Sequence, residues 1–151
     1  MKMIYEEKQN FHVVFLGFLL LLIVIIGTMD FTIYTIYPAD WATVVADGTV
    51  IFLIFIFVNF RKLEIKITDD FLEFGFGIFR KKIPRKKIIS CKTFEVRFGQ
   101  YFGIGIRYGL NRTILYNTRF GKAVRIKLRG QKRDYVITTN NQKKFCNALK
   151  R

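Results

Sequence analysis

The sequence predicts a membrane-spanning α-helical hairpin followed by a basic α+β domain. Residues 9–60 contain no Lys or Arg and hold two long apolar runs, whereas residues 61–151 carry 24 Lys and Arg against six carboxylates, a net charge of +18. After residue 62 the apolar residues alternate with polar ones, the period of half-buried strands. We therefore expect a hairpin over residues 1–60 and a separate domain over residues 61–151.

The first predicted span covers residues 11–29. It reads FHVVFLGFLLLLIVIIGTM, with His12 as its one titratable side chain, and about twenty such residues cross the hydrocarbon core of a bilayer. A cleaved signal peptide is the alternative. The flank before this run has as many Glu as Lys, and no small-x-small cleavage site follows it, so a retained span is favoured.

The second predicted span covers residues 41–60 and contains Asp47 beside Gly48. A carboxylate inside lipid costs several kcal/mol unless it is neutral or paired. The favoured interpretation places Asp47 near the outer headgroups. In the alternative, Asp47, Gly48 and Gly17 mark a surface that packs against the helices of a partner, since small and polar residues are typical of such contacts.

The connector between the spans is acidic and rich in Tyr, whereas Arg61 and Lys62 follow the second span directly. The positive-inside rule therefore predicts a cytoplasmic-membrane protein with an external connector and with both termini in the cytoplasm.

The domain is expected to contain about seven short strands and one C-terminal helix. Asn140 or Asn141 can cap that helix, which then places Phe145, Ala148 and Leu149 on one face. The predicted strands cover residues 63–68, 71–79, 88–97, 103–108, 113–117, 123–128 and 135–138.

The most basic segment of the chain follows the second of these strands. It is interpreted as a loop or edge segment that contacts anionic lipid headgroups, since each Lys or Arg near an anionic leaflet contributes about 1 kcal/mol. An acidic protein partner and a solvated loop that only obeys the positive-inside rule stay open. The six cations are Arg80, Lys81, Lys82, Arg85, Lys86 and Lys87.

A second candidate surface combines aromatic residues with arginines. Core or membrane-interface packing is favoured over nucleobase stacking for these aromatics, given the membrane anchor. The glycines between residues 103 and 109 miss the dinucleotide fingerprint by one position, and no helix follows them; they are expected to bend a strand. The interface candidates are Arg97, Tyr101, Phe102 and Arg107, with Phe98 beside them.

No catalytic set, metal site or cofactor is predicted. The sequence has a single histidine, and its two cysteines, Cys91 and Cys146, lack metal-ligand spacing. In a cytosolic domain they are expected to stay as reduced thiols. A nucleophile with an adjacent base cannot be assembled, so the protein is expected not to be an enzyme.

Four stretches resemble the bacterial pleckstrin-homology-like domain of small membrane proteins with an N-terminal transmembrane hairpin. They read LEIKITDDFLEFGFGIF, RKKIPRKKIISCKTFEV, YFGIGIRYG and KAVRIKLRGQKRDYVITTNNQKKFCNALK. The resemblance rests on the Ile83-Pro84 step, on the GxGIR stretch ending at Arg107 and on the last hairpin and helix. It implies a β-sandwich or partly open barrel of about seven strands with one C-terminal helix. It implies neither catalytic residues nor inositide recognition.

The expected function is that of a non-enzymatic interaction or assembly module whose basic domain meets anionic phospholipid or an acidic protein partner. An accessory subunit of a larger membrane complex is the alternative. Nucleic-acid binding by the tethered domain is less favoured and would show a steep salt dependence.

Overall fold

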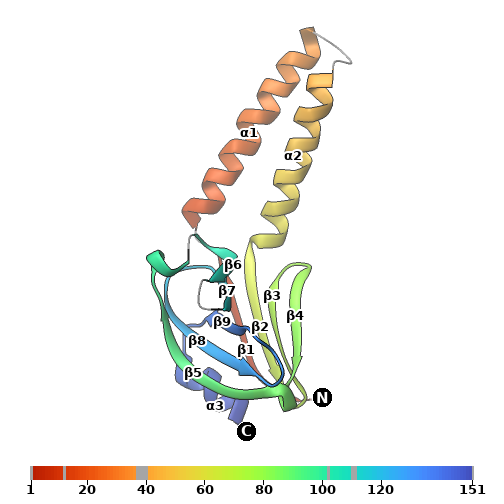
Figure 1. The fold of residues 1–151 in the computed structure, drawn as a ribbon. Helices are drawn as coiled ribbons and strands as arrows, with labels where there is room; N and C mark the ends of the chain where they lie inside the picture. Colours follow the sequence, from red (N-terminus) through yellow and green to blue (C-terminus); the bar gives the residue numbers. More distant parts are fainter. Residues whose placement is uncertain (1, 12, 37–40, 102, 110–111, 151) are drawn as a thin grey trace.

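The computed structural model describes residues 2–11, 13–36, 41–101, 103–109 and 112–150. Two long helices project side by side from one end of a β-rich domain, and both chain termini lie at the opposite end (Figure 1). The domain contains two sheets and a C-terminal helix. The expected combination of two apolar helices with an α+β domain is therefore confirmed.

The two projecting helices are α1 (Val13–Ile36) and α2 (Trp41–Phe60). At 1.5 Å per residue they are about 36 Å and about 30 Å long, and both are long and apolar enough to cross a membrane. Only 6% and 11% of their most apolar windows are buried, so they do not form the core of a soluble domain. The second helix matches its prediction, whereas α1 continues seven residues beyond the predicted end at residue 29.

The first sheet is a four-stranded antiparallel meander of β1 (Met3–Asn10), β2 (Lys62–Thr68), β3 (Phe71–Phe76) and β4 (Phe79–Pro84). Its first strand pairs with β2 from Met3↔Thr68 to Asn10↔Lys62. The expected division at residue 60 thus differs from the structure, because the N-terminal segment belongs to the β-domain. The helical hairpin is an insertion between two paired strands.

The second sheet has the order β5-β8-β9-β7-β6. Its strands are β5 (Ile88–Val96), β6 (Gly105–Gly109), β7 (Thr113–Asn117), β8 (Gly121–Leu128) and β9 (Asp134–Thr138). All its pairs are antiparallel except β7 with β9. Two short 3-10 helices, η1 (Arg85–Lys87) and η2 (Phe98–Gln100), flank β5.

The described residues form nine strands where about seven were expected. One additional strand is β1, and the other is β4, which begins where the second strand was expected to end. The basic segment 80–87 is predicted to be a loop or edge because it begins where the second predicted strand ends and continues past Pro84, and its residues 80–84 form β4. It is indeed an edge strand: it pairs only with β3, so charged side chains can point into solvent from it.

The main core lies between the two sheets and below the hairpin. The alternation predicted for β2 is confirmed, because Leu63, Ile65 and Ile67 are fully buried. Phe74 of β3 meets Tyr116 and Tyr135 from the other sheet edge-on, at ring distances of 4.9 and 5.6 Å. These aromatic contacts join the sheets into one domain.

The inner face of β1 is polar, unlike that of β2. Buried Glu7 accepts hydrogen bonds from the Tyr5 hydroxyl, the Gln9 amide, the Thr139 hydroxyl and the Asn140 backbone N–H. This network ties the first strand to the segment after β9. A buried carboxylate is tolerated here because several donors satisfy it.

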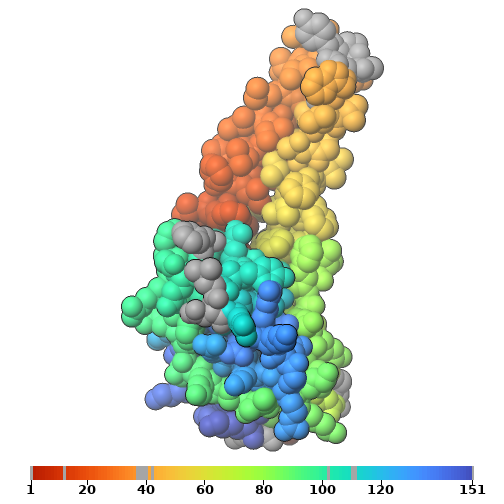
Figure 2. Space-filling view, viewed as in Figure 1, coloured from red at the N-terminus to blue at the C-terminus, as the bar shows by residue number. Residues whose placement is uncertain are grey.

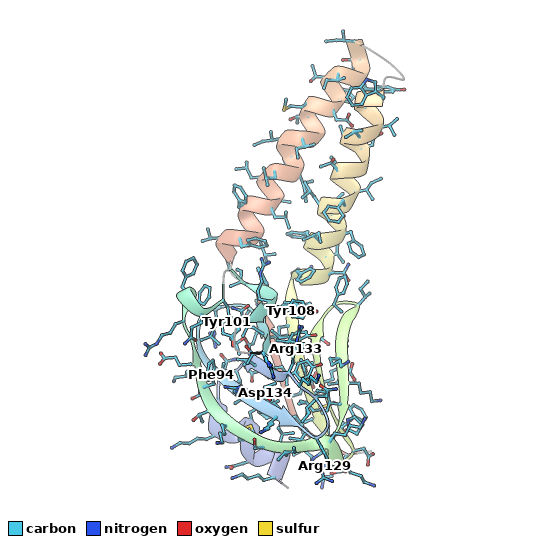
Figure 3. The ribbon with its side chains drawn as sticks, viewed as in Figure 1. Phe94, Tyr101, Tyr108, Arg129, Arg133 and Asp134 are labelled. Atoms are coloured by element: carbon cyan, nitrogen blue, oxygen red, sulfur yellow. A yellow bond between two sulfur atoms is a disulfide. The ribbon has the colours of Figure 1, made fainter. Side chains whose placement is uncertain are left out.

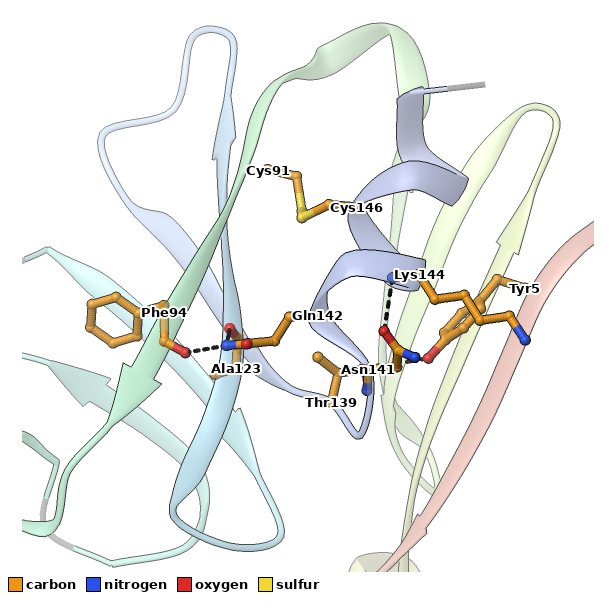
Figure 4. The surroundings of a disulfide bond; sticks show 9 residues. All are labelled: Tyr5, Cys91, Phe94, Ala123, Thr139, Asn141, Gln142, Lys144 and Cys146. Atoms are coloured by element: carbon orange, nitrogen blue, oxygen red, sulfur yellow. Dashed lines mark hydrogen bonds between the residues drawn. A yellow bond between two sulfur atoms is a disulfide. The ribbon is translucent and has the colours of Figure 1, made fainter.

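The last helix, α3 (Gln142–Lys150), covers one end of the domain and packs on β5 and β8. Of the two predicted caps, Asn141 is the one used: its side-chain oxygen accepts from the backbone N–H of Lys144. Gln142 donates to the carbonyls of Phe94 on β5 and Ala123 on β8 (Figure 4).

A disulfide joins Cys91 of β5 to Cys146 of α3, with the two Cα atoms 5.6 Å apart (Figure 4). The prediction of two reduced thiols is therefore wrong for this structure. The cysteines are 55 residues apart in the sequence, and only the packing of the helix on the strand brings them within bonding distance.

Candidate functional site

The predicted basic segment extends along the whole height of the β-domain. We call the end that meets the helices the hairpin end and the opposite end, with η1 and the two termini, the far end. The turn before β4 lies at the hairpin end, since the Ile78 N–H donates to Asn59 of α2. At about 3.3 Å per residue, Pro84 lies roughly 17 Å from Phe79 along the strand. The six cations therefore do not form one patch.

Two of these cations make contacts within the first sheet. Arg80 forms ion pairs with Glu64 at 2.9 Å and with Glu73 at 3.6 Å, and it donates to the Gly77 carbonyl. The Lys82 ammonium lies 3.7 Å from the centroid of the Phe71 ring. These contacts hold the two side chains against their own sheet.

Arg85 has a structural position at the far end. Its guanidinium donates to the carbonyls of Ala148 and Leu149, the last turn of α3, and to the carbonyl of Thr68 at the end of β2. A cation at a helix C-terminus satisfies carbonyls that have no partner within the helix. The side chain thus fastens the last helix to the first sheet.

The remaining cations are exposed, and two of them gather with a cation from another sheet. The Arg129 N–H donates to the Lys87 carbonyl, and Figure 3 places Arg129 at the far end. Lys86 and Lys87 therefore share an exposed basic surface with Arg129. Lys81 is exposed on the edge strand between the two ends.

The aromatic and arginine residues of the second candidate surface also do not form one exposed patch. Tyr101 is buried and bonds the Thr113 hydroxyl at 2.6 Å, so it is a core residue that a partner does not reach. Arg97 and Arg107 are exposed, and the η2 helix after Arg97 lies at the hairpin end (Figure 1). Phe102 and His12 lie outside the described residues.

A cluster of phenylalanines fixes the hairpin to the domain. The Phe11 N–H donates to the Arg61 carbonyl, so the two chain segments that enter the helices are bonded together. Asn59 packs on Gly77, where an added Cβ would lie 2.5 Å from the Asn59 side-chain oxygen. Ring contacts with centroids 4.9 to 6.3 Å apart join Phe11, Phe15, Phe55, Phe60, Phe76 and Phe79.

A cleft of about 210 Å³ opens at this junction. Gly105, with a φ of +106°, lets the start of β6 pass the Phe60 ring, which would lie 3.8 Å from an added Cβ. The cleft was not predicted, because its walls come from segments far apart in the sequence. It is lined by Phe11, Phe15, Ile56, Phe60, Ile104, Gly105, Ile106 and Arg107.

The carboxyl of Asp47 lies close to the carboxyl of Asp30 on the facing helix. Gly48 is exposed, and an added Cβ there meets nothing within 4 Å. The acidic side chain is therefore engaged within the hairpin, whereas the glycine beside it faces open space.

Three buried tyrosines of the domain have a raised pKa. Burial, reinforced by the hydrogen bond to Glu7, raises the pKa of Tyr5 to about 12. Burial also raises the pKa of Tyr116 to about 12, and it raises the pKa of Tyr135. These three side chains belong to the buried core. Within the described residues, no three His, Cys, Asp or Glu side chains are grouped to hold a metal ion.

Comparisons with models of known protein families, with curated proteins and with solved structures find no match to this chain.

Proposed function

We propose that this protein is a non-enzymatic interaction module, anchored in a cytoplasmic membrane by its helical hairpin, whose basic domain contacts anionic phospholipid headgroups. The observation that carries this proposal is the distribution of charge around the base of two apolar helices. Five cations lie on chain segments next to the helix ends: Arg61 and Lys62 follow α2, Arg80 follows the turn bonded to Asn59, Arg97 lies between β5 and η2, and Arg107 lines the cleft.

Distance decides which cations meet the membrane. Electrostatic attraction falls off over a Debye length of about 8 Å at physiological ionic strength. Residues at the far end lie about two Debye lengths or more below the helix ends. The lipid-facing residues are thus those at the hairpin end. From the predicted patch Arg80 lies there, but its guanidinium is paired with Glu64 and Glu73, so the other cations at this end carry the lipid contact. Lys86, Lys87 and Arg129 face the cytoplasm, where an acidic protein partner could bind them.

The bacterial pleckstrin-homology-like fold remains our proposal for the domain. A four-stranded meander followed by antiparallel β5, β8 and β9 and by a C-terminal helix supports it. Two features depart from the simple pattern. The hairpin follows a first strand, and β6 and β7 are added at the edge of the second sheet.

Amide hydrogen exchange on the full chain in nanodiscs tests the lipid contact. Residues 1–10 must be kept, because a fragment starting at residue 61 loses β1 and exposes the edge of β2. We expect residues 77–80 and 97–101 to exchange more slowly in nanodiscs containing phosphatidylglycerol than in pure phosphatidylcholine. High salt should reverse the difference.

A double variant, Lys62→Gln with Arg97→Gln, should lose most of this protection, whereas Lys86→Gln with Lys87→Gln should keep it. Equal exchange in the two lipids, or protection confined to the far end, would contradict the proposal.

An accessory subunit of a larger membrane complex is the second candidate. The open space beside Gly48 on α2 favours it, because small residues let a partner helix approach closely. Gly48→Leu should then weaken co-purification of other membrane proteins with the chain, whereas an independent anchor should be unaffected. The alternative is rejected if both forms purify alone.

A further inference from the structure

The cleft at the base of the hairpin has the composition of a site for one amphipathic molecule. It is lined by phenylalanine and isoleucine residues together with Arg107, whose side chain is exposed. The site thus combines an apolar interior with a single cation at its edge. Phospholipids present the complementary pair, an acyl chain joined to a phosphate.

The position of the cleft matches the depth of a lipid headgroup. It opens where the two helices meet the β-domain, between Phe15 and Ile56 on the helices and two isoleucines of the domain, Ile104 just before β6 and Ile106 in it. In Figure 2 the surface of the segment around β6 lies directly below the helix bases. In a bilayer spanned by the hairpin, this level is the boundary between acyl chains and headgroups.

Arg107 is placed to bind an anion. Its guanidinium lies over the backbone of Gly103, where an added Cβ would be 3.1 Å from Nη2 and 3.3 Å from Nε. Across the part of the chain that the structure describes, no carboxylate forms an ion pair with it. An arginine without a carboxylate partner keeps its planar donors available for a phosphate.

The size of the cleft limits what it can hold. About 210 Å³ is below the roughly 300–1,000 Å³ of sites that enclose a whole drug-sized ligand. The cleft therefore takes part of a molecule whose remainder stays in the bilayer. Moving a methylene group from water into the cleft contributes about 0.8 kcal/mol to binding. Moving it from the acyl chains of the bilayer contributes little, because both environments are apolar. Selectivity between lipids therefore rests on the headgroup.

We propose that this cleft holds one anionic phospholipid from the surrounding leaflet, with an acyl segment among the phenylalanines and its phosphate on Arg107. The inference rests on the proposed membrane placement and deepens it. It differs from the general contact of a basic surface with a membrane, because it assigns a stoichiometric site with a defined lining.

Native mass spectrometry of the full chain, released from nanodiscs of mixed phosphatidylcholine and phosphatidylglycerol, tests the site. We expect one retained phosphatidylglycerol per chain, enriched over its share of the bilayer. Arg107→Gln should reduce this enrichment about tenfold, since it removes a charge-assisted hydrogen bond. Ile106→Trp should abolish retention by filling the cleft.

The matched control is Arg129→Gln, which makes the same change in charge at the far end and should retain the lipid. Equal retention by wild type, Arg107→Gln and Ile106→Trp would overturn the site, because the lipid would then be nonspecifically bound. Release of a protein dimer without lipid would also overturn it, since a second copy would be the occupant.

Failure of the underlying membrane placement gives a different result. If alkaline carbonate extracts the chain from membranes, the proposed function fails together with the site. If the chain resists extraction but retains no phosphatidylglycerol, the site alone is rejected.

Discussion

Arginine and lysine residues that adjoin in the sequence have different roles in this protein. Within the run from Arg80 to Lys87, one arginine pairs with carboxylates of its own sheet and another holds the end of α3. The lysines that follow are exposed. Charge density along the sequence therefore does not identify a binding surface, since the partners of each cation come from other strands.

The role of Arg85 predicts a selective loss of stability. Arg85→Gln removes the donors to the Ala148 and Leu149 carbonyls and should lower the free energy of unfolding by about 1–3 kcal/mol. Faster amide exchange at the last turn of α3 should accompany the loss. Lys86→Gln, one residue later and exposed, should change stability by less than about 0.5 kcal/mol. Similar losses in the two variants would contradict this role.

The buried tyrosines predict instability at high pH. Their folded-state pKa of about 12 for Tyr5 and Tyr116 exceeds the unfolded value near 10. Their stabilising contribution is therefore complete below pH 10 and is lost as the pH rises towards 12. Thermal unfolding of the full chain in detergent should show a falling midpoint over this interval.

Tyr116→Phe is the matched variant for the alkaline transition, since it removes one titrating hydroxyl and keeps the ring. The unfolding free energy of this variant should fall less between pH 10 and 12 than that of the wild type, by on the order of 2 kcal/mol. Its melting midpoint should therefore also fall less. Tyr34→Phe, exposed on α1, should behave as wild type. An unchanged slope in Tyr116→Phe would refute the assignment.

At the scale of elements, β1 shows how a buried polar face conceals a strand. Its inward residues are Tyr5, Glu7 and Gln9, whereas the inward residues of β2 are Leu and Ile. The two strands have the same alternation of burial. Hydrophobic patterning detects only the second, because the first is stabilised by hydrogen bonds to Thr118, Thr138 and Thr139.

Removal of the Glu7 carboxylate should detach this strand. Glu7→Ala leaves the Tyr5, Gln9 and Thr139 donors buried without their acceptor, so we expect a loss of about 3 kcal/mol. Exchange of the β1 amides should increase in parallel. Glu6→Ala, on the outer face of the same strand, is the control and should cost less than about 0.5 kcal/mol. Equal losses of unfolding free energy in Glu7→Ala and Glu6→Ala would show that the hydrogen bonds to Glu7 do not stabilise the fold.

At the scale of the whole molecule, insertion of the hairpin between paired strands gives the helices a rigid base. The chain leaves β1 at Asn10 and re-enters the sheet at Lys62, two residues that face each other in the sheet. Because the strands are hydrogen-bonded and the phenylalanine cluster joins both helices to the first sheet, the domain cannot swing freely below the helices. The same face of the domain thus stays next to the helix ends.

The orientation of the molecule across the membrane is a prediction on which two features disagree. Arg61 and Lys62 beside α2 favour a cytoplasmic domain, whereas a persistent disulfide favours an oxidising compartment. We favour the charge argument, because residues 9–60 contain no Lys or Arg whereas Arg61 and Lys62 follow α2 directly, which is the asymmetry that the positive-inside rule uses.

Trypsin tests this orientation, because residues 9–60 contain no cleavage site. In inverted membrane vesicles trypsin should leave a membrane-embedded fragment of residues 9–61, whereas in intact spheroplasts the chain should stay uncut. Digestion from the outside would place the domain beyond the membrane, and the disulfide would then be its normal state. A non-reducing gel of the untreated chain reports the state of the cysteines independently.

The sequence alone determined the features that depend on local patterns. Two runs of about twenty apolar residues predict helices of membrane length, and alternating Leu and Ile predict β2 with its inward face. A Thr-Asn turn before an amphipathic segment predicts α3 and a cap at Asn140 or Asn141, of which the structure uses Asn141. Each of these signals lies within one window of the chain, where period and capping chemistry are fixed by neighbouring residues.

Only the tertiary structure decided which distant residues meet. It placed residues 3–10 in the sheet, joined Cys91 to Cys146, spread the basic run from the hairpin end to the far end and formed the cleft at Arg107. The physical reason is common to all four. Each depends on contacts between segments separated by tens of residues, and packing, rather than local preference, selects among the pairings that the sequence permits.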